Sequence, residues 1–103
     1  ENIADLGGIL LGLEAYKKTE KFKSNKTVAG LTPLQRYFCG YALGWLGHTR
    51  DESLRNQLLT DVHSPAKYRV NGPFVDVDEF YTAFNIKPGD KMYRADSLRV
   101  RIW

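Results

Sequence analysis

The sequence predicts a mainly α-helical fold, with several helices, a loop-rich segment and a short extended C-terminal tail. Apolar residues recur at helical spacing near the start, helix-capping signals begin later segments, and strand-like alternation is confined to the last residues. With 103 residues and 43% hydrophobic side chains, the chain can form one folded unit with a modest core.

The first predicted helix covers residues 1–18. Ile3, Leu6, Leu10 and Leu13 recur at helical spacing, which predicts one buried face.

A second face of the same helix carries Glu1, Asp5, Gly8 and Gly12, at spacings of about one turn each. A glycine costs an exposed helix about 1 kcal/mol relative to alanine. These glycines therefore indicate close approach by another segment, such as a packed helix.

The second predicted helix covers residues 31–47. Thr32 is the expected N-cap, Pro33 the first helical residue, and Gln35 the partner in a capping box. The apolar face, which we interpret as core, comprises Leu34, Tyr37, Phe38, Tyr41, Ala42 and Trp45.

Two further capping boxes predict shorter helices. Thr49 with Glu52 begins one that continues to about residue 60, and Asp76 with Glu79 begins the other.

Residues 60–73, TDVHSPAKYRVNGP, are predicted to form a loop that carries His63 and Arg69. Pro65 disfavours helical geometry at the residue before it, and Asn-Gly-Pro at 71–73 is typical of a turn. The alternating tail, residues 96–103, predicts a short strand or an extended segment.

The carboxylates of Glu1 and Asp5 have two interpretations. Acidic residues are favoured in the first turn of any helix, so both side chains can simply be solvated. Alternatively, one carboxylate binds zinc and the second orients a histidine ligand. The second interpretation requires a partner helix with His-Glu-x-x-His, a motif that is not in this sequence, whose only histidines are His48 and His63.

His63 and Arg69 are candidates for binding a carbonyl substrate. A donor imidazole and a guanidinium suit a carbonyl group and its developing oxyanion. A loop histidine can also cap a helix or bind a backbone carbonyl. His48 follows Gly47 at a helix end and is set aside.

Composition and charge exclude several classes of partner. The net charge of +3 comes largely from the lysine run between residues 17 and 26, and no aromatic-rich basic groove accompanies it, so we predict no nucleic-acid partner. No apolar run is long enough to predict a membrane segment. Cys39 is the only cysteine, so no intrachain disulfide can form.

The ordered set ENIAD at residues 1–5, TDVHSPAKYRV at 60–70 and RVRIW at 99–103 resembles the C-terminal part of the neprilysin-like zinc metallopeptidases, family M13. The resemblance implies that residues 1–103 are the C-terminal part of the catalytic domain, without the His-Glu-x-x-His part and the N-terminal lobe.

The resemblance also implies roles for individual residues. Glu1 matches the third protein ligand of zinc, and Asp5 the carboxylate that hydrogen-bonds a histidine ligand. His63 matches the histidine that stabilises the oxyanion, Arg69 the arginine that binds the substrate carbonyl, and Asp61 is expected to orient His63.

The implied parent is a zinc metalloendopeptidase that hydrolyses oligopeptides through a zinc-activated water. We expect this fragment to bind no zinc, to be inactive alone, and to self-associate through uncovered apolar surface. Animal members usually carry a cysteine near the terminal Trp, whereas this chain has Arg101 and Ile102 there. This favours a bacterial, extracytoplasmic enzyme of the periplasm, envelope or secreted fraction. The alternative is an autonomous helical interaction module without catalysis.

Overall fold

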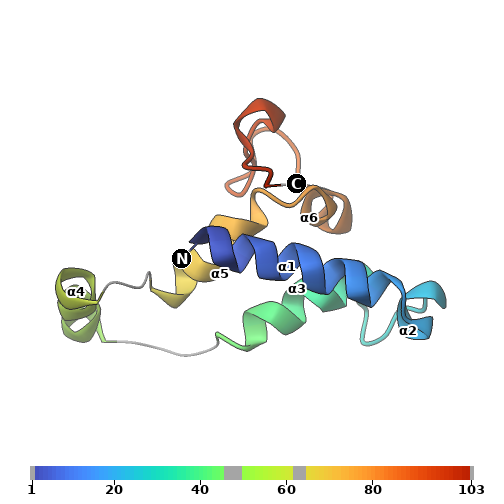
Figure 1. The fold of residues 1–103 in the computed structure, drawn as a ribbon, viewed down its shortest axis with the longest axis horizontal. Helices are drawn as coiled ribbons and strands as arrows, with labels where there is room; N and C mark the ends of the chain where they lie inside the picture. Colours follow the sequence, from blue (N-terminus) through green and yellow to red (C-terminus); the bar gives the residue numbers. More distant parts are fainter. Residues whose placement is uncertain (1, 46–49, 62–64, 103) are drawn as a thin grey trace.

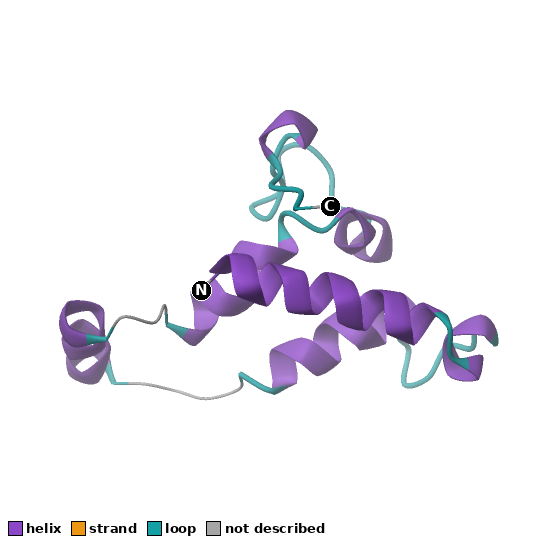
Figure 2. Cartoon of the chain, in the orientation of Figure 1, coloured by secondary structure: helices purple, strands orange, loops and turns teal. Residues whose placement is uncertain are grey.

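The computed structural model describes residues 2–45, 50–61 and 65–102. Over these residues the chain forms helices joined by loops and turns, and no strand is present (Figure 2). The elements are α1 (Asn2–Lys17), α2 (Glu20–Lys23), α3 (Pro33–Leu43), α4 (Asp51–Thr60), α5 (Ala66–Phe74), α6 (Asp78–Phe84) and the 3-10 helix η1 (Asp96–Leu98). The predicted mainly α-helical fold is confirmed.

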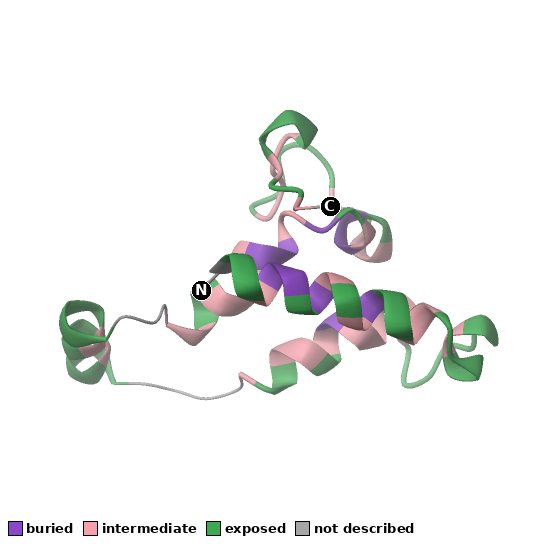
Figure 3. Cartoon of the chain, in the orientation of Figure 1, coloured by how far each residue is buried: buried purple, intermediate pink, exposed green. Residues whose placement is uncertain are grey.

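The core lies where α1 packs on α5, as Figure 1 shows, and where α3 packs on α6. Figure 3 shows buried positions alternating with exposed ones along α1. The buried hydrophobic residues are Leu6, Ile9, Leu13, Phe38, Phe74, Val77, Phe80 and Tyr81.

Helix α1 buries a face slightly rotated from the predicted one. Leu6, Ile9 and Leu13 are each at most 2% exposed, and Leu10 packs against their cluster. Ile3 is 65% exposed, so its assignment to the buried face is wrong. Helix α1 itself carries apolar and small residues on all sides. Its hydrophobic periodicity therefore does not single out one face as the buried one.

Helix α3 begins with the predicted capping box. The Gln35 backbone N–H donates to Thr32 Oγ1 at 3.3 Å, and the Thr32 backbone N–H donates to Gln35 Oε1 at 3.0 Å. The Gln35 side chain also donates to the Ala83 carbonyl at 2.9 Å, which ties the start of α3 to α6.

An aromatic cluster joins α3, α5 and α6. The Phe38 ring meets Phe74 and Phe80 edge to face, with centroids 5.1 Å and 5.5 Å away. Such pairs contribute about 0.5–1.5 kcal/mol beyond the area they bury, so this cluster fixes the relative positions of the three helices.

Gly12 allows a side chain of α3 to reach the backbone of α1. The Tyr37 hydroxyl donates to the Ile9 carbonyl at 2.6 Å, and a Cβ placed on Gly12 would lie 2.6 Å from the same hydroxyl oxygen. The close approach predicted at this face is therefore confirmed at Gly12. Gly8 differs, because it is exposed and no described atom lies within 4 Å of its Cβ position.

Helix α5 occupies much of the segment predicted as a loop, so that prediction is wrong for residues 66–73. Pro65 is the N-cap, where its extended ψ of 153° suits the residue before a helix. Pro73 lies inside the last turn and is fully buried, and Phe74 is 4% exposed. Burial of these two residues outweighs the local preference of Asn-Gly-Pro for a turn.

Helix α6 lacks the predicted capping box of Asp76 and Glu79, because it begins after Val77, which provides no side-chain cap. Asp76 binds the C-terminal segment instead. Its Oδ1 accepts from Arg94 Nη1 at 2.8 Å and from the Val100 backbone N–H at 3.0 Å.

The C-terminal segment is held against α6 by Arg99. Its guanidinium carbon lies 3.6 Å from the centre of the Tyr81 ring, and its Nε donates to the Arg94 carbonyl at 2.9 Å. After the 3-10 helix η1, residues 99–102 form neither helix nor strand. The prediction of a strand or an extended segment over residues 96–103 is therefore wrong for residues 96–98, which are helical, and residues 99–102 form no strand.

Helix α4 stands apart from the other helices (Figure 1) and has no buried residue. Its N-cap is Arg50, without a side-chain cap, in place of the predicted Thr49, which lies outside the described residues. Leu58 and Leu59 are 59% and 85% exposed. Throughout the described part of the chain, no helix combines the length and apolar character needed to cross a membrane.

Substituting the two glycines of α1 should have opposite effects on stability. Gly8→Ala should stabilise the chain by up to about 1 kcal/mol, because alanine has the higher helix propensity and its methyl group meets no described atom. Gly12→Ala should destabilise it, because the methyl group displaces the Tyr37 hydroxyl from Ile9. Urea unfolding midpoints measure both changes.

The Tyr37→Phe background is the matched control. Without the hydroxyl, Gly12→Ala should become neutral or stabilising. Equal destabilisation by Gly12→Ala with and without the hydroxyl would contradict the assigned contact.

Candidate active site

The crossing of α1 and α5 brings together two of the predicted site residues. Asp5 lies in the first turn of α1 and Arg69 lies near the middle of α5, 64 residues later. Leu6 and Phe74 from the same two helices belong to one buried cluster. Apolar packing therefore fixes the crossing, and the two charged side chains meet beside it.

Asp5 and Arg69 form a bidentate ion pair. Arg69 Nε donates to Asp5 Oδ2 at 2.9 Å and Arg69 Nη2 donates to Oδ1 at 2.8 Å. The side chains are only 18% exposed for Arg69 and 12% for Asp5. Hydrogen bonding from Arg69 lowers the pKa of Asp5 despite the opposing effect of burial, so the carboxylate is anionic at neutral pH.

One aromatic side chain of the α3 region contacts this pair, and a second is influenced by its charges. The Arg69 guanidinium carbon lies 4.4 Å from the centre of the Trp45 ring, a cation–π contact. The pKa of Tyr41 is raised, mainly by burial and also by the Asp5 carboxylate, while Trp45 and Arg69 oppose the shift. The candidate site is thus an ion pair with aromatic side chains near it.

The other predicted site residues are placed differently. Glu1 and His63 lie outside the described residues, so the structure says nothing of their side chains. Asp61 is exposed and is the C-cap that follows α4, where its backbone N–H donates to the Gln57 carbonyl at 2.8 Å. The predicted proximity of His63 and Arg69 therefore stays a prediction.

Sequence reasoning missed both the direct Asp5–Arg69 contact and the contribution of Trp45. Trp45 was predicted to be core, but it is half-buried and lies beyond the last residue of α3. Its position just after Gly44, at the end of the apolar face, is the signal that separates it from core residues in mid-helix.

The described residues do not form a metal site on their own. They contain no group of three or more His, Cys, Asp or Glu side chains able to hold a metal ion. A catalytic zinc site generally takes three protein ligands and keeps one open position. A zinc centre at this end of α1 therefore needs ligands in addition to these residues.

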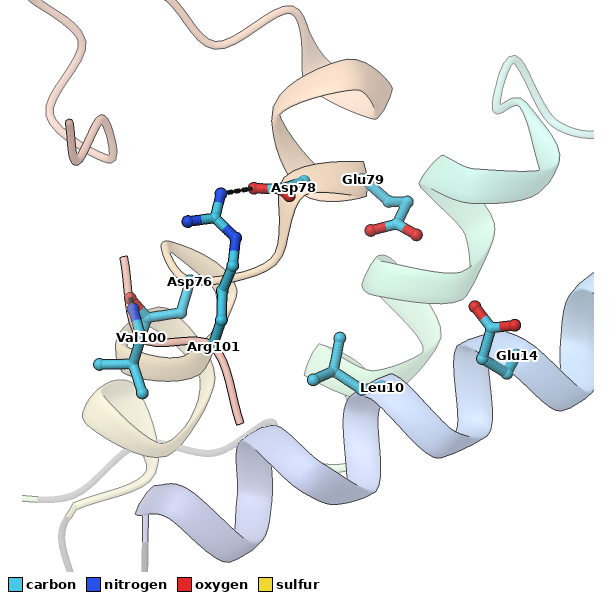
Figure 4. Close-up of a pocket in the computed structure, with 7 residues that line it drawn as sticks. All are labelled: Leu10, Glu14, Asp76, Asp78, Glu79, Val100 and Arg101. Atoms are coloured by element: carbon cyan, nitrogen blue, oxygen red, sulfur yellow. Dashed lines mark hydrogen bonds and ion pairs between the residues drawn. The ribbon is translucent and has the colours of Figure 1, made fainter. Parts of the chain in front are cut away.

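A cleft of about 240 Å³ lies between α1, α6 and the C-terminal segment, and Figure 4 shows carboxylates around it. These acids are paired with cations of the same chain: Asp76 with Arg94 at 2.8 Å, Asp78 with Arg101 at 2.8 Å, and Glu79 with Lys17 at 2.6 Å. We therefore interpret this cleft as structural.

Comparison with known families matches residues 1–100 to Peptidase family M13. The chain is 36% identical over its full length to a neutral endopeptidase of Lactobacillus helveticus and 39% identical to one of Lactococcus lactis. It is 38% identical to mouse membrane metallo-endopeptidase-like 1. In each case the chain spans only 14–15% of the relative's length.

The fold is also similar to part of a solved structure. The zinc metalloprotease Zmp1 of Mycobacterium tuberculosis, in complex with an inhibitor, superposes with a TM-score of 0.84 at 36% identity. The match covers 99% of this chain and 16% of Zmp1.

The ion pair predicts a specific pH dependence of stability. Because the pKa of Asp5 is lowered in the folded state, the unfolded chain binds more protons near the ordinary value of 3.8. The contribution of the pair is thus present above that value and is lost as pH falls through the lowered pKa. Asp5→Asn should cost about 1–3 kcal/mol at neutral pH and less in acid.

Urea unfolding of both chains at about pH 6 and about pH 3 measures this difference. Asp51→Asn, at an exposed position of α4, is the matched control and should change little at either pH. If Asp5→Asn lowered the free energy of unfolding equally at both pH values, the assigned ion pair would be contradicted.

Proposed function

Because the chain belongs to peptidase family M13, we propose that residues 1–103 form the C-terminal part of the catalytic domain of a zinc metalloendopeptidase that hydrolyses oligopeptides. The observation that carries this proposal is the Asp5–Arg69 ion pair. The resemblance assigns Asp5 to the zinc-binding side of the site and Arg69 to substrate binding. The ion pair joins these two residues.

Asp5 can serve two partners at once. Each carboxylate oxygen accepts one hydrogen bond from Arg69 and retains a further lone pair, so the anion can also accept from an imidazole N–H. We assign to Asp5 the role of orienting a zinc-ligand histidine from the His-Glu-x-x-His segment of the longer protein.

Glu1, one turn before Asp5, is the proposed zinc ligand of this chain. The other two ligands are assigned to the histidines of the longer protein, so the 103-residue chain is expected to be inactive alone. Bound zinc supplies a water of lowered pKa and polarises the peptide carbonyl.

The substrate side is assigned to His63 and Arg69. His63 is proposed to donate to the oxyanion that develops on the attacked carbonyl, with Asp61 orienting its imidazole. Arg69 is proposed to donate to a substrate carbonyl next to the cleaved bond. Its fixation by Asp5 supports this role, because a preorganised donor loses little entropy on binding.

The exposed face of α1 supports the proposal that this chain packs against other parts of a larger enzyme. Ile3 and Leu11 are 65% and 63% exposed there, next to the exposed Gly8. A helix with apolar residues on all sides is typical of a buried position. The same surface supports self-association of the isolated chain.

The alternative, a helical interaction module without catalysis, would dock a partner helix on the glycine-lined face of α1. Family membership favours the peptidase, and the reading frame upstream of Glu1 separates the two: His-Glu-x-x-His there supports the enzyme. The proposed bacterial, extracytoplasmic location rests on the resemblance and on Cys39 being the only cysteine.

Replacing Glu1 should remove zinc from the longer protein. Glu1→Ala should abolish stoichiometric zinc and peptidase activity, whereas Asp5→Asn should weaken zinc binding by about 10–100-fold. Metal analysis after dialysis measures both effects. Glu20→Ala, at an exposed position of α2, is the control. Retention of full zinc content by Glu1→Ala would refute the ligand role.

His63 and Arg69 should affect different kinetic constants. His63→Phe should lower kcat by about 100–1,000-fold with little change in KM, because an oxyanion donor acts mainly in the transition state. Arg69→Met should raise KM by about tenfold or more, because it removes charged hydrogen bonds to bound substrate. Steady-state hydrolysis of a short peptide measures both, and the opposite pattern would overturn the assignments.

A further inference from the structure

A cavity lined by cations lies at the C-terminal end of α1, where α2 and the loop that follows it meet α3 (Figure 1). Its volume is about 320 Å³, near the lower limit of small-ligand sites, which span about 300–1,000 Å³. The lining residues are Tyr16, Lys21, Ser24, Lys26, Val28 and Arg36. Three of these six are cationic and none is acidic.

The charges of this cavity are not balanced by the chain itself. Among the described residues, Lys21, Lys26 and Arg36 form no ion pair. The cleft between α1, α6 and the C-terminal segment differs, because its acids are paired with cations. Like charges around one cavity repel one another, so an anion bound there is stabilised by all three.

Arg36 is fixed in the cavity wall by backbone carbonyls. Its Nη1 donates to the Lys26 carbonyl at 2.8 Å and to the Leu31 carbonyl at 2.9 Å. Neither Nε nor Nη2 donates to another group in the described part of the chain. The guanidinium is therefore held in place without being neutralised, and it retains N–H donors for a ligand.

The loop that carries Lys26 and Val28 is also held by its own backbone. Val28 and Leu31 exchange two hydrogen bonds of 3.0 Å across a tight turn. In this turn Ala29 has a φ of 52°, a left-handed conformation that residues with side chains rarely adopt. The turn and the bonds to Arg36 preorganise the loop, so little entropy is lost when a ligand binds.

The lining chemistry favours a phosphate group. A phosphate monoester carries about −1.5 to −2 charges at neutral pH and has three strong acceptor oxygens, which suits three cations better than a singly charged carboxylate does. A guanidinium can bind two phosphate oxygens, and each lysine adds a point charge. Val28, which is 53% exposed, offers an apolar contact to the organic part of such an ester.

We propose that the cavity formed by Lys21, Lys26 and Arg36 binds a small phosphate monoester. This site goes beyond the proposed function, because it uses no residue assigned to zinc or to the peptide substrate. A free phosphate ester and the phosphate headgroup of a lipid present the same chemistry to it.

The experiment titrates inorganic phosphate into a full-length M13 peptidase that carries this chain, at low ionic strength in a calorimeter. Saturable binding is expected at about 0.1–1 mM, because both lysines are exposed and solvent screens their charges. Lys21→Gln and Lys26→Gln should each weaken it about two- to fivefold. Lys23→Gln is the matched control, since this exposed lysine of α2 does not line the cavity.

The comparison of the variants locates the site, because phosphate bound elsewhere in the enzyme would respond equally to all three substitutions. Equal affinities of the Lys21→Gln, Lys26→Gln and Lys23→Gln enzymes would overturn the proposal, as would a lack of saturable binding up to about 10 mM. Arg36 is left unchanged, because it also holds the loop. Unaltered peptide hydrolysis by each variant reports that it has folded correctly.

Phosphatidylcholine vesicles with and without phosphatidic acid distinguish the two sources of phosphate. Retention on the phosphatidic acid vesicles that is lost in the Lys26→Gln enzyme supports a lipid headgroup. Binding of inorganic phosphate without retention on these vesicles supports a free phosphate ester.

Discussion

The bidentate ion pair between Asp5 and Arg69 is the interaction on which the proposed site depends. It joins residues 64 positions apart and lies at the crossing of α1 and α5 with little exposure to solvent. A largely buried ion pair is weak as a source of net stability, because desolvation of both charges offsets their attraction. The ion pair instead specifies the geometry of the crossing. Losing either partner leaves a charge poorly solvated, so packings of α1 and α5 that separate the two side chains are disfavoured.

Apolar packing makes this geometry possible. The cluster of Phe38, Phe74 and Phe80 fixes α3, α5 and α6 relative to one another, and Leu6 places α1 against the same core. The hydroxyl of Tyr37 adds a directional bond from α3 to α1. The same framework that buries the apolar side chains thus sets the positions of the charged ones.

Local signals in the sequence predicted the helices well where capping chemistry is unambiguous, as at Thr32. They failed at α5, where Asn-Gly-Pro is typical of a turn but burial of Pro73 and Phe74 decides the outcome. For the site, the resemblance identified Asp5 and Arg69 separately. It could not reveal their contact, because side chains from segments so far apart in the sequence meet only once the helices are packed.

Helix α4 has a different basis for its stability from the rest of the fold. It spans 10 residues, buries none of them and has no side-chain cap, and isolated helices of this length are marginal in water. Its amide hydrogens should therefore exchange with solvent ahead of those of α1, and its backbone should be an early target for proteases. Any neighbour that covered Leu58 and Leu59 would protect this segment from both.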